Sequence, residues 1–198
     1  MSSTPALEPS PDAAATARFG MWLFLASEIL FFGVVLFVYG IARGRSPAGF
    51  QAAGARTDLL LGTVNTGLLL TSSLAVALAA EGSAVLARRG FAAAALLGGS
   101  FLAIKGIEYH REWVEGLFPG PDFALADVPG AELFFTWYFV ATSLHALHLA
   151  IGIGLCLLLA AQPALRLRWR TGVALYWHFV DLVWIFLYPL IYLVGARP

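Results

Sequence analysis

The sequence predicts an all-α, polytopic membrane protein, a bundle of five transmembrane helices. Of its 198 residues, 60% are hydrophobic and only 12% are charged, whereas a soluble domain is about 45–50% apolar and about 25% charged. The apolar residues also form five long unbroken runs, each near the roughly 20 helical residues that cross a hydrocarbon core. Strands of a membrane barrel would alternate in polarity instead. This composition excludes a soluble enzyme domain and a disordered chain.

The predicted helices follow one another in a single domain of residues 18–198. Gly44, Arg45 and Pro47 end the first apolar run, the third run becomes polar from Lys105 onward, and the fourth ends at Gln162. The predicted ranges are 19–41, 59–80, 90–112, 132–161 and 171–194. Residues 1–17 contain no Lys or Arg and are rich in Ala, Ser and Pro, so we expect a disordered tail there and not a signal peptide.

Charged residues outside the helices predict the orientation and exclude several kinds of site. Six arginines flank the helices on the side of the N-terminus and five on the other side, which favours a cytoplasmic N-terminus and, with five spans, an outer C-terminus. The formal net charge of zero argues against nucleic acid as a partner. The single cysteine, Cys156, excludes an internal disulfide and a cysteine-cluster metal site.

Glu28 is the sharpest candidate functional residue, because an ionisable group at membrane depth costs several kcal/mol unless it is paired or hydrated. It lies about ten residues into the first helix, with no basic residue within a turn. A carboxyl isolated in hydrocarbon tends to stay protonated. Two interpretations stay open. Glu28 is either a neutral group hydrogen-bonded to a neighbouring helix or lipid headgroup, or a carboxyl that exchanges protons or anchors lipid.

Other polar residues at depth predict contacts between and within helices. Lys105 and Glu108 are spaced i,i+3, so we expect them to pair on one helix face. His178 has the same spacing from Asp181, and we expect that pair to hold both groups in lipid. Hydrogen bonding between close-packed helices is predicted for a polar set in the second helix, which is Asn65, Thr66, Ser72 and Ser73.

The histidines are candidate ligands for haem or a metal ion, and their pattern disfavours both. A bis-histidine haem needs histidines on two facing helices at matched depth, but His145 and His148 lie one turn apart on one helix. A metal ion would also need converging carboxylates, and only Asp181 and Glu28 are deep enough. We therefore interpret the histidines as structural groups with satisfied hydrogen bonds, and expect no metal or cofactor to be bound by this chain.

Several motifs, in order over about 175 residues, resemble subunit III of the haem-copper oxidases. A HxxH pair followed about 27 residues later by YWHFVDxVWxF is the most specific of them. The matching segments are RFGMWLFLASEILFF (18–32), LGTVNTGLLLTSS (61–73), FLAIKGIEYHREW (101–113), FVATSLHALHLAIG (139–152) and YWHFVDLVWIFLYPLIY (176–192). Mitochondrial-type members have seven helices, so this chain looks like the five-helix bacterial form.

The resemblance implies an accessory subunit, without a catalytic centre of its own, of a bacterial inner-membrane terminal oxidase that uses cytochrome c or quinol. Such a subunit stabilises the catalytic subunit and supports proton uptake and oxygen access. The implied partners are subunit I directly, then subunit II and small subunits, with bound phospholipid, and with haem and copper in the partner subunits. Glu28 matches the family's intramembrane glutamate. The matching structural polar residues are Arg18, Asn65, Lys105, Glu108, His145, His148, Trp177, His178 and Asp181.

Three alternatives remain. The first is a related accessory subunit of a nitric oxide reductase system, which these residues do not separate from the oxidase subunit. The second is a proton-coupled transporter that uses Glu28, although the chain has no internal repeat and no matched pair of broken helices. The third is a small haem-binding membrane cytochrome.

Overall fold

The computed structural model describes residues 11–195, except for the side chains of 11–14, 17, 18 and 163–168. Within these residues the protein is all-helical and has no strand. The helices are α1 (Pro11–Arg45), α2 (Pro47–Gly54), α3 (Leu59–Glu81), α4 (Ala84–Val114), α5 (Ala131–Ala161) and α6 (Pro163–Tyr192). All except α2 are long and apolar enough to cross a membrane. The predicted class, an α-helical protein with five membrane spans, is confirmed.

The helix ends differ from the predicted ranges for identifiable reasons. Residues 11–17, which we placed in a tail, are the first turns of α1, and residues 1–10 lie outside the described part of the chain. At its other end α1 continues through Gly44 to Arg45, because one glycine costs a helix only about 1 kcal/mol. Ser83 starts α4 early by accepting a hydrogen bond from the Leu86 amide at 3.4 Å. Pro163 starts α6 eight residues before the predicted residue 171, since proline suits the first turn of a helix.

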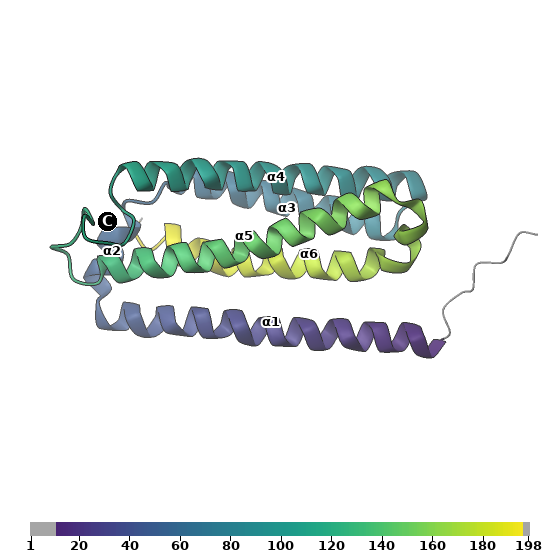
Figure 1. Ribbon diagram of the computed structural model, residues 1–198, viewed down its shortest axis with the longest axis horizontal. Helices are drawn as coiled ribbons and strands as arrows, with labels where there is room; N and C mark the ends of the chain where they lie inside the picture. The colour runs from purple at the N-terminus through teal and green to yellow at the C-terminus, as the bar shows by residue number, and fades with distance from the viewer. Residues whose placement is uncertain (1–10, 196–198) are drawn as a thin grey trace, which may run out of the picture.

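Helices α3 to α6 form a four-helix bundle in which successive helices run in opposite directions, and α1 lies along one side of it (Figure 1). The short helix α2 and the loop of residues 115–130 gather at one end of the bundle, which we call the α2 end. The core lies between α3, α4, α5 and α6. It contains aliphatic and aromatic side chains, and α1 adds Tyr39 to it. The largest fully buried residues are Trp177, Trp184, Tyr39, Tyr138 and Tyr192.

Glycines allow the helices of the bundle to pack closely. A Cβ atom at Gly90 of α4 would lie 2.7 Å from the carbonyl oxygen of Ala75 in α3. At Gly62 of α3 it would lie 2.8 Å from ring atoms of Tyr192. Small residues at such contacts are typical of membrane helices, which associate through close packing and hydrogen bonds because lipid is as apolar as their side chains.

Helix α1 is the most exposed span, since only 11% of its most apolar stretch of residues is buried in the protein. The side chains on its outer face are large and apolar, and they include Trp22, Leu30, Val34 and Phe37. Polar contacts attach α1 to the bundle. The Tyr39 hydroxyl donates to the Leu190 carbonyl at 2.7 Å, and the Trp137 indole donates to the Val35 carbonyl at 2.8 Å. The outer face of α1 is therefore available to lipid or to another protein.

We predict that Gly90→Ala lowers the thermal unfolding midpoint of the detergent-purified chain, because the new methyl group meets the backbone of α3. Overpacking of this kind typically costs about 1–3 kcal/mol. Gly99→Ala is the matched control, since nothing lies within 4 Å of a Cβ at this exposed position of the same helix. Equal midpoints for the two variants would contradict the close α3–α4 contact.

Candidate functional site

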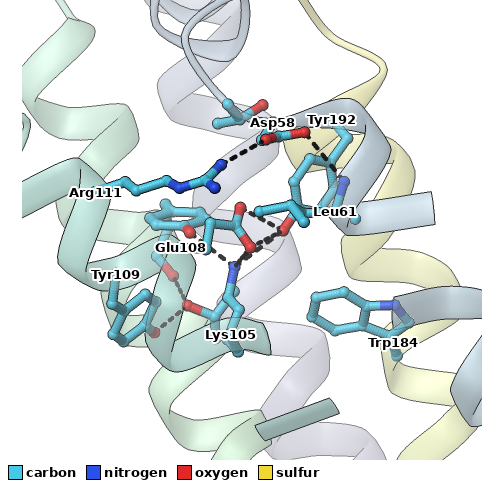
Figure 2. A network of polar contacts seen from close by, with 12 residues as sticks. Asp58, Leu61, Lys105, Glu108, Tyr109, Arg111, Trp184 and Tyr192 are labelled. Carbon is cyan, nitrogen blue, oxygen red and sulfur yellow. Dashed lines mark hydrogen bonds and ion pairs between the residues drawn. The ribbon is translucent and has the colours of Figure 1, made fainter. Parts of the chain in front are cut away.

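A buried ion pair lies inside the bundle near the α2 end. Lys105 and Glu108 are 3% and 2% exposed, and the Lys105 Nζ lies 3.1 Å from Glu108 Oε2 (Figure 2). The ammonium group also donates to the hydroxyls of Tyr138 at 2.7 Å and Tyr192 at 2.9 Å. These three contacts match the three protons of an ammonium group. The predicted pairing of Lys105 with Glu108 is confirmed.

Aromatic side chains from two other helices surround this ion pair. The Tyr192 hydroxyl of α6 donates to the two carboxylate oxygens of Glu108 at 2.7 and 2.9 Å. The Lys105 Nζ lies 4.4 Å from the ring centroid of Tyr138 and 5.8 Å from that of Trp184, within reach of a cation–π interaction. Side chains of α5 and α6 thus stabilise the charged pair on α4. The spacing of residues within α4 could not predict these contacts between helices.

Glu112 belongs to the same face of α4, one turn beyond Glu108, and it is also buried. The sequence patterns did not predict Glu112, Tyr138 or Tyr192 as part of this site. A signal for Glu112 was present, since its spacing of seven residues from Lys105 returns to the same helix face. The tyrosines had no such signal, because they are 33 and 87 residues away from Lys105 in the chain.

A second ion pair lies at the surface of the α2 end. Arg111 Nη1 is 3.3 Å from Asp58 Oδ2, with the two side chains 59% and 38% exposed. The other oxygen of Asp58 accepts the Leu61 amide at 3.1 Å and so caps α3 (Figure 2). This pair joins the end of α4 to the start of α3 where the bundle meets water.

Glu28 contacts the bundle through His148. Glu28 Oε2 lies 3.1 Å from His148 Nε2, with the side chains 18% and 15% exposed. The other ring nitrogen of His148 is 2.8 Å from the Leu144 carbonyl, which can only accept, so Nδ1 carries a proton. One proton is then shared between Glu28 and Nε2, as a neutral acid with a neutral imidazole or as a carboxylate with an imidazolium. This contact is the hydrogen bond to a neighbouring helix that we expect if Glu28 is a neutral, hydrogen-bonded group.

The predicted pairing of His178 with Asp181 is wrong. His178 Nδ1 is hydrogen-bonded to the Ser73 hydroxyl of α3 at 2.7 Å. Asp181 is buried, and neither of its carboxylate oxygens has a hydrogen-bond partner in the described part of the chain. The i,i+3 spacing permits such a pair, as Lys105 and Glu108 show, but a hydroxyl on α3 lies within hydrogen-bond distance of the His178 ring and takes its place.

Two further predicted polar residues, Asn65 and His145, are buried without a hydrogen-bond partner among the described residues. The His145 ring packs instead against Trp184, at 5.0 Å between centroids, and against Phe101. The prediction of satisfied histidines is therefore wrong for His145. Trp177 donates to the Ser72 hydroxyl at 3.0 Å, as expected for contact between helices. Arg18 lies on α1, but its side chain is outside the described residues.

The structure does not bring the histidines and carboxylates together as a ligand set. His148 faces Glu28 on α1, His178 faces Ser73 on α3, and His145 lies in the aromatic core. Across the described residues, no group of three or more His, Cys, Asp and Glu side chains could hold a metal ion. The contacts observed at these sites are hydrogen bonds and ion pairs.

Comparison with known proteins gives a consistent family assignment. The family described as Cytochrome c oxidase subunit III matches residues 11–196. The chain is 28% identical over 200 residues to the cytochrome bo(3) ubiquinol oxidase subunit 3 of Pseudomonas aeruginosa, covering 93% of this chain and 88% of that protein. It is 32% identical over 203 residues to the cytochrome c oxidase subunit 3 of Carassius auratus and of Oncorhynchus mykiss, covering 94% of this chain and 73% of each relative.

We predict that Lys105→Met destabilises the detergent-purified chain by about 3–5 kcal/mol, because it leaves Glu108 as a buried carboxylate without its cation. Thermal or denaturant unfolding measures this loss. Arg111→Met is the matched control on the same helix, and an exposed pair of this kind contributes only about 0–1 kcal/mol. Similar losses in the two variants would contradict the structural importance of the buried pair.

Proposed function

Because this chain belongs to the cytochrome c oxidase subunit III family, we propose that it is a non-catalytic subunit of a respiratory haem-copper terminal oxidase. In this role it binds the catalytic subunit I directly, with subunit II and small subunits as further partners. It stabilises subunit I during oxygen reduction and supports proton uptake and oxygen access. Haem and copper belong to the partner subunits in this proposal, and the buried groups of this chain have the chemistry of proton carriers.

The Glu28–His148 pair is the observation that carries the proton-linked part of the proposal. It places an acid and a base 3.1 Å apart within a membrane span, between α1 and α5. A carboxyl and an imidazole at hydrogen-bond distance can pass a proton between them without creating a net charge. Both side chains keep some exposure, so a group on a partner subunit could deliver a proton to the pair or remove one.

The outer face of α1 supports the proposed contacts with partners and lipid. Its large apolar side chains, such as Phe19, Leu30 and Phe37, are more than two-thirds exposed in the isolated chain. An apolar face of this kind is compatible with a neighbouring subunit, with bound phospholipid, and with dissolved oxygen, which partitions into hydrocarbon. We propose that subunit I and phospholipid share this face.

We propose a location in the inner membrane of a bacterium, with the N-terminus in the cytoplasm and the C-terminus outside. The cluster of Arg166, Arg168 and Arg170 in the first turns of α6 supports this orientation under the positive-inside rule. In the same orientation, the α2 end of the bundle faces the outer side of the membrane.

Glu28→Gln tests the proton-linked role. We expect the complex to assemble, because glutamine has nearly the same shape and can still hydrogen-bond to His148, but to lose turnover rate or lifetime severalfold under sustained oxygen reduction. Oxygen consumption by the purified complex measures the two quantities. Ser27→Ala, which changes an exposed neighbour on the same helix, should match the wild type. Identical rates and lifetimes for the Gln variant would assign Glu28 a structural role only.

The subunit assignment has a separate test. Affinity purification of this chain in mild detergent should recover a haem-containing partner, while the isolated chain should have no visible absorbance. The partner's activity, oxygen or nitric oxide reduction, separates the oxidase subunit from the companion of a nitric oxide reductase. Haem bands in the isolated chain, or substrate-dependent ion flux in liposomes that contain only this chain, would contradict the proposal.

A further inference from the structure

The buried cluster on α4 has two carboxyl groups for one ammonium group. Glu112 is 4% exposed and lies on the same helix face as Lys105 and Glu108. The Lys105 ammonium directs its contacts to Glu108, Tyr138 and Tyr192. Glu112 receives none of them, and neither of its carboxylate oxygens has a hydrogen-bond partner in the described part of the chain. An ionised Glu112 would therefore be a buried negative charge without a bonded cation.

The other groups around Glu112 do not supply that cation. Tyr109 of α4, Tyr138 of α5 and Tyr192 of α6 are uncharged hydroxyl groups near the cluster. Glu115, which is exposed just beyond the end of α4, is close enough for its charge to repel a charge on Glu112. Arg111 points to Asp58 at the surface. The Lys105 ammonium attracts a charge on Glu112 through space, but the cost of desolvating the ionised carboxylate, several kcal/mol, is larger, so the neutral acid is favoured.

We propose that Glu112 is a proton-binding site of this chain, which holds a proton in the resting protein and exchanges it with water at the α2 end of the bundle. The site is separate from the Glu28–His148 pair, and it does not depend on the proposed role in an oxidase. On release, the O–H bond of Glu112 breaks, its proton passes to the Glu115 carboxylate or to water, and Glu112 is left as a carboxylate.

The position of Glu112 suits exchange with the aqueous phase. It lies two residues before the end of α4 at Val114, and the exposed Glu115 follows directly. A surface carboxylate at this place can collect protons and pass them inward. Inside the protein, Tyr138 accepts from Lys105 and keeps its own hydroxyl proton as a donor, so it can stabilise the carboxylate when the proton has left.

Infrared difference spectroscopy of the purified full chain tests this site without any partner subunit. The C=O stretching band of a protonated carboxylic acid is recorded between neutral and alkaline pH, in H₂O and in D₂O. We expect the wild type to lose one deuterium-sensitive band as the pH rises, and Glu112→Gln to lack that band. Glu115→Gln and Glu28→Gln should keep it, because they change a surface carboxylate and the separate pair on α1. A band that persists in Glu112→Gln, or that disappears in Glu28→Gln alone, overturns the proposal.

Glu108→Gln provides a second test that leaves Glu112 in place. Once Glu108 is neutral, the Lys105 ammonium has Glu112 as its remaining buried counter-charge, so we expect Glu112 to ionise and the acid band to disappear at neutral pH. A band of unchanged size in Glu108→Gln would show that Glu112 does not stay protonated because Glu108 already neutralises Lys105. That result would overturn the proposal even if Glu112→Gln failed to fold.

Discussion

The ammonium group of Lys105 can remain inside an apolar bundle only because other helices supply its hydrogen-bond acceptors. Glu108 on the same helix balances its charge. The hydroxyl oxygens of Tyr138 on α5 and Tyr192 on α6 accept its two other hydrogen bonds. This requirement reaches α3 as well, since the Tyr192 ring occupies space that a side chain at position 62 would fill, and glycine is found there. One buried charge thus constrains all four helices of the bundle.

Hydrogen bonds also join the helices nearer the middle of the bundle, where the donors are indole groups of α6 and the acceptors are hydroxyl groups of α3. Trp184 donates to the Thr66 hydroxyl, and Trp177 donates to the Ser72 hydroxyl, each at 3.0 Å. Gly98 and Gly152 leave room for the Trp177 ring, which would lie about 3 Å from a Cβ at either position. Hydrogen bonds and close packing of this kind are the forces available to helices in lipid, where burial of apolar surface gives little advantage.

Features that depend on local residue spacing were predictable from the sequence, whereas contacts with side chains on other helices were not. The lengths of the apolar runs predicted the five spans, and the spacing of Lys105 and Glu108 predicted their ion pair. The same rule failed for His178, because Ser73 on another helix was the better partner. Local spacing also could not place Glu28 beside His148, 120 residues away. The short α2 was missed because it contains too few residues to have a recognisable apolar period.

Glu28 and Glu112 avoid an isolated buried charge in different ways, and the difference separates what each of them can do. Glu28 has a histidine beside it, so the pair is neutral overall whichever of the two holds the shared proton. Removing that proton would leave an uncompensated charge, so net proton movement at Glu28 requires a group from outside this chain, which suits a partly exposed site on the side of α1. Glu112 has no base of its own. It does have a surface carboxylate next to it and hydroxyl donors within the cluster, so its proton can be exchanged with water by this chain alone.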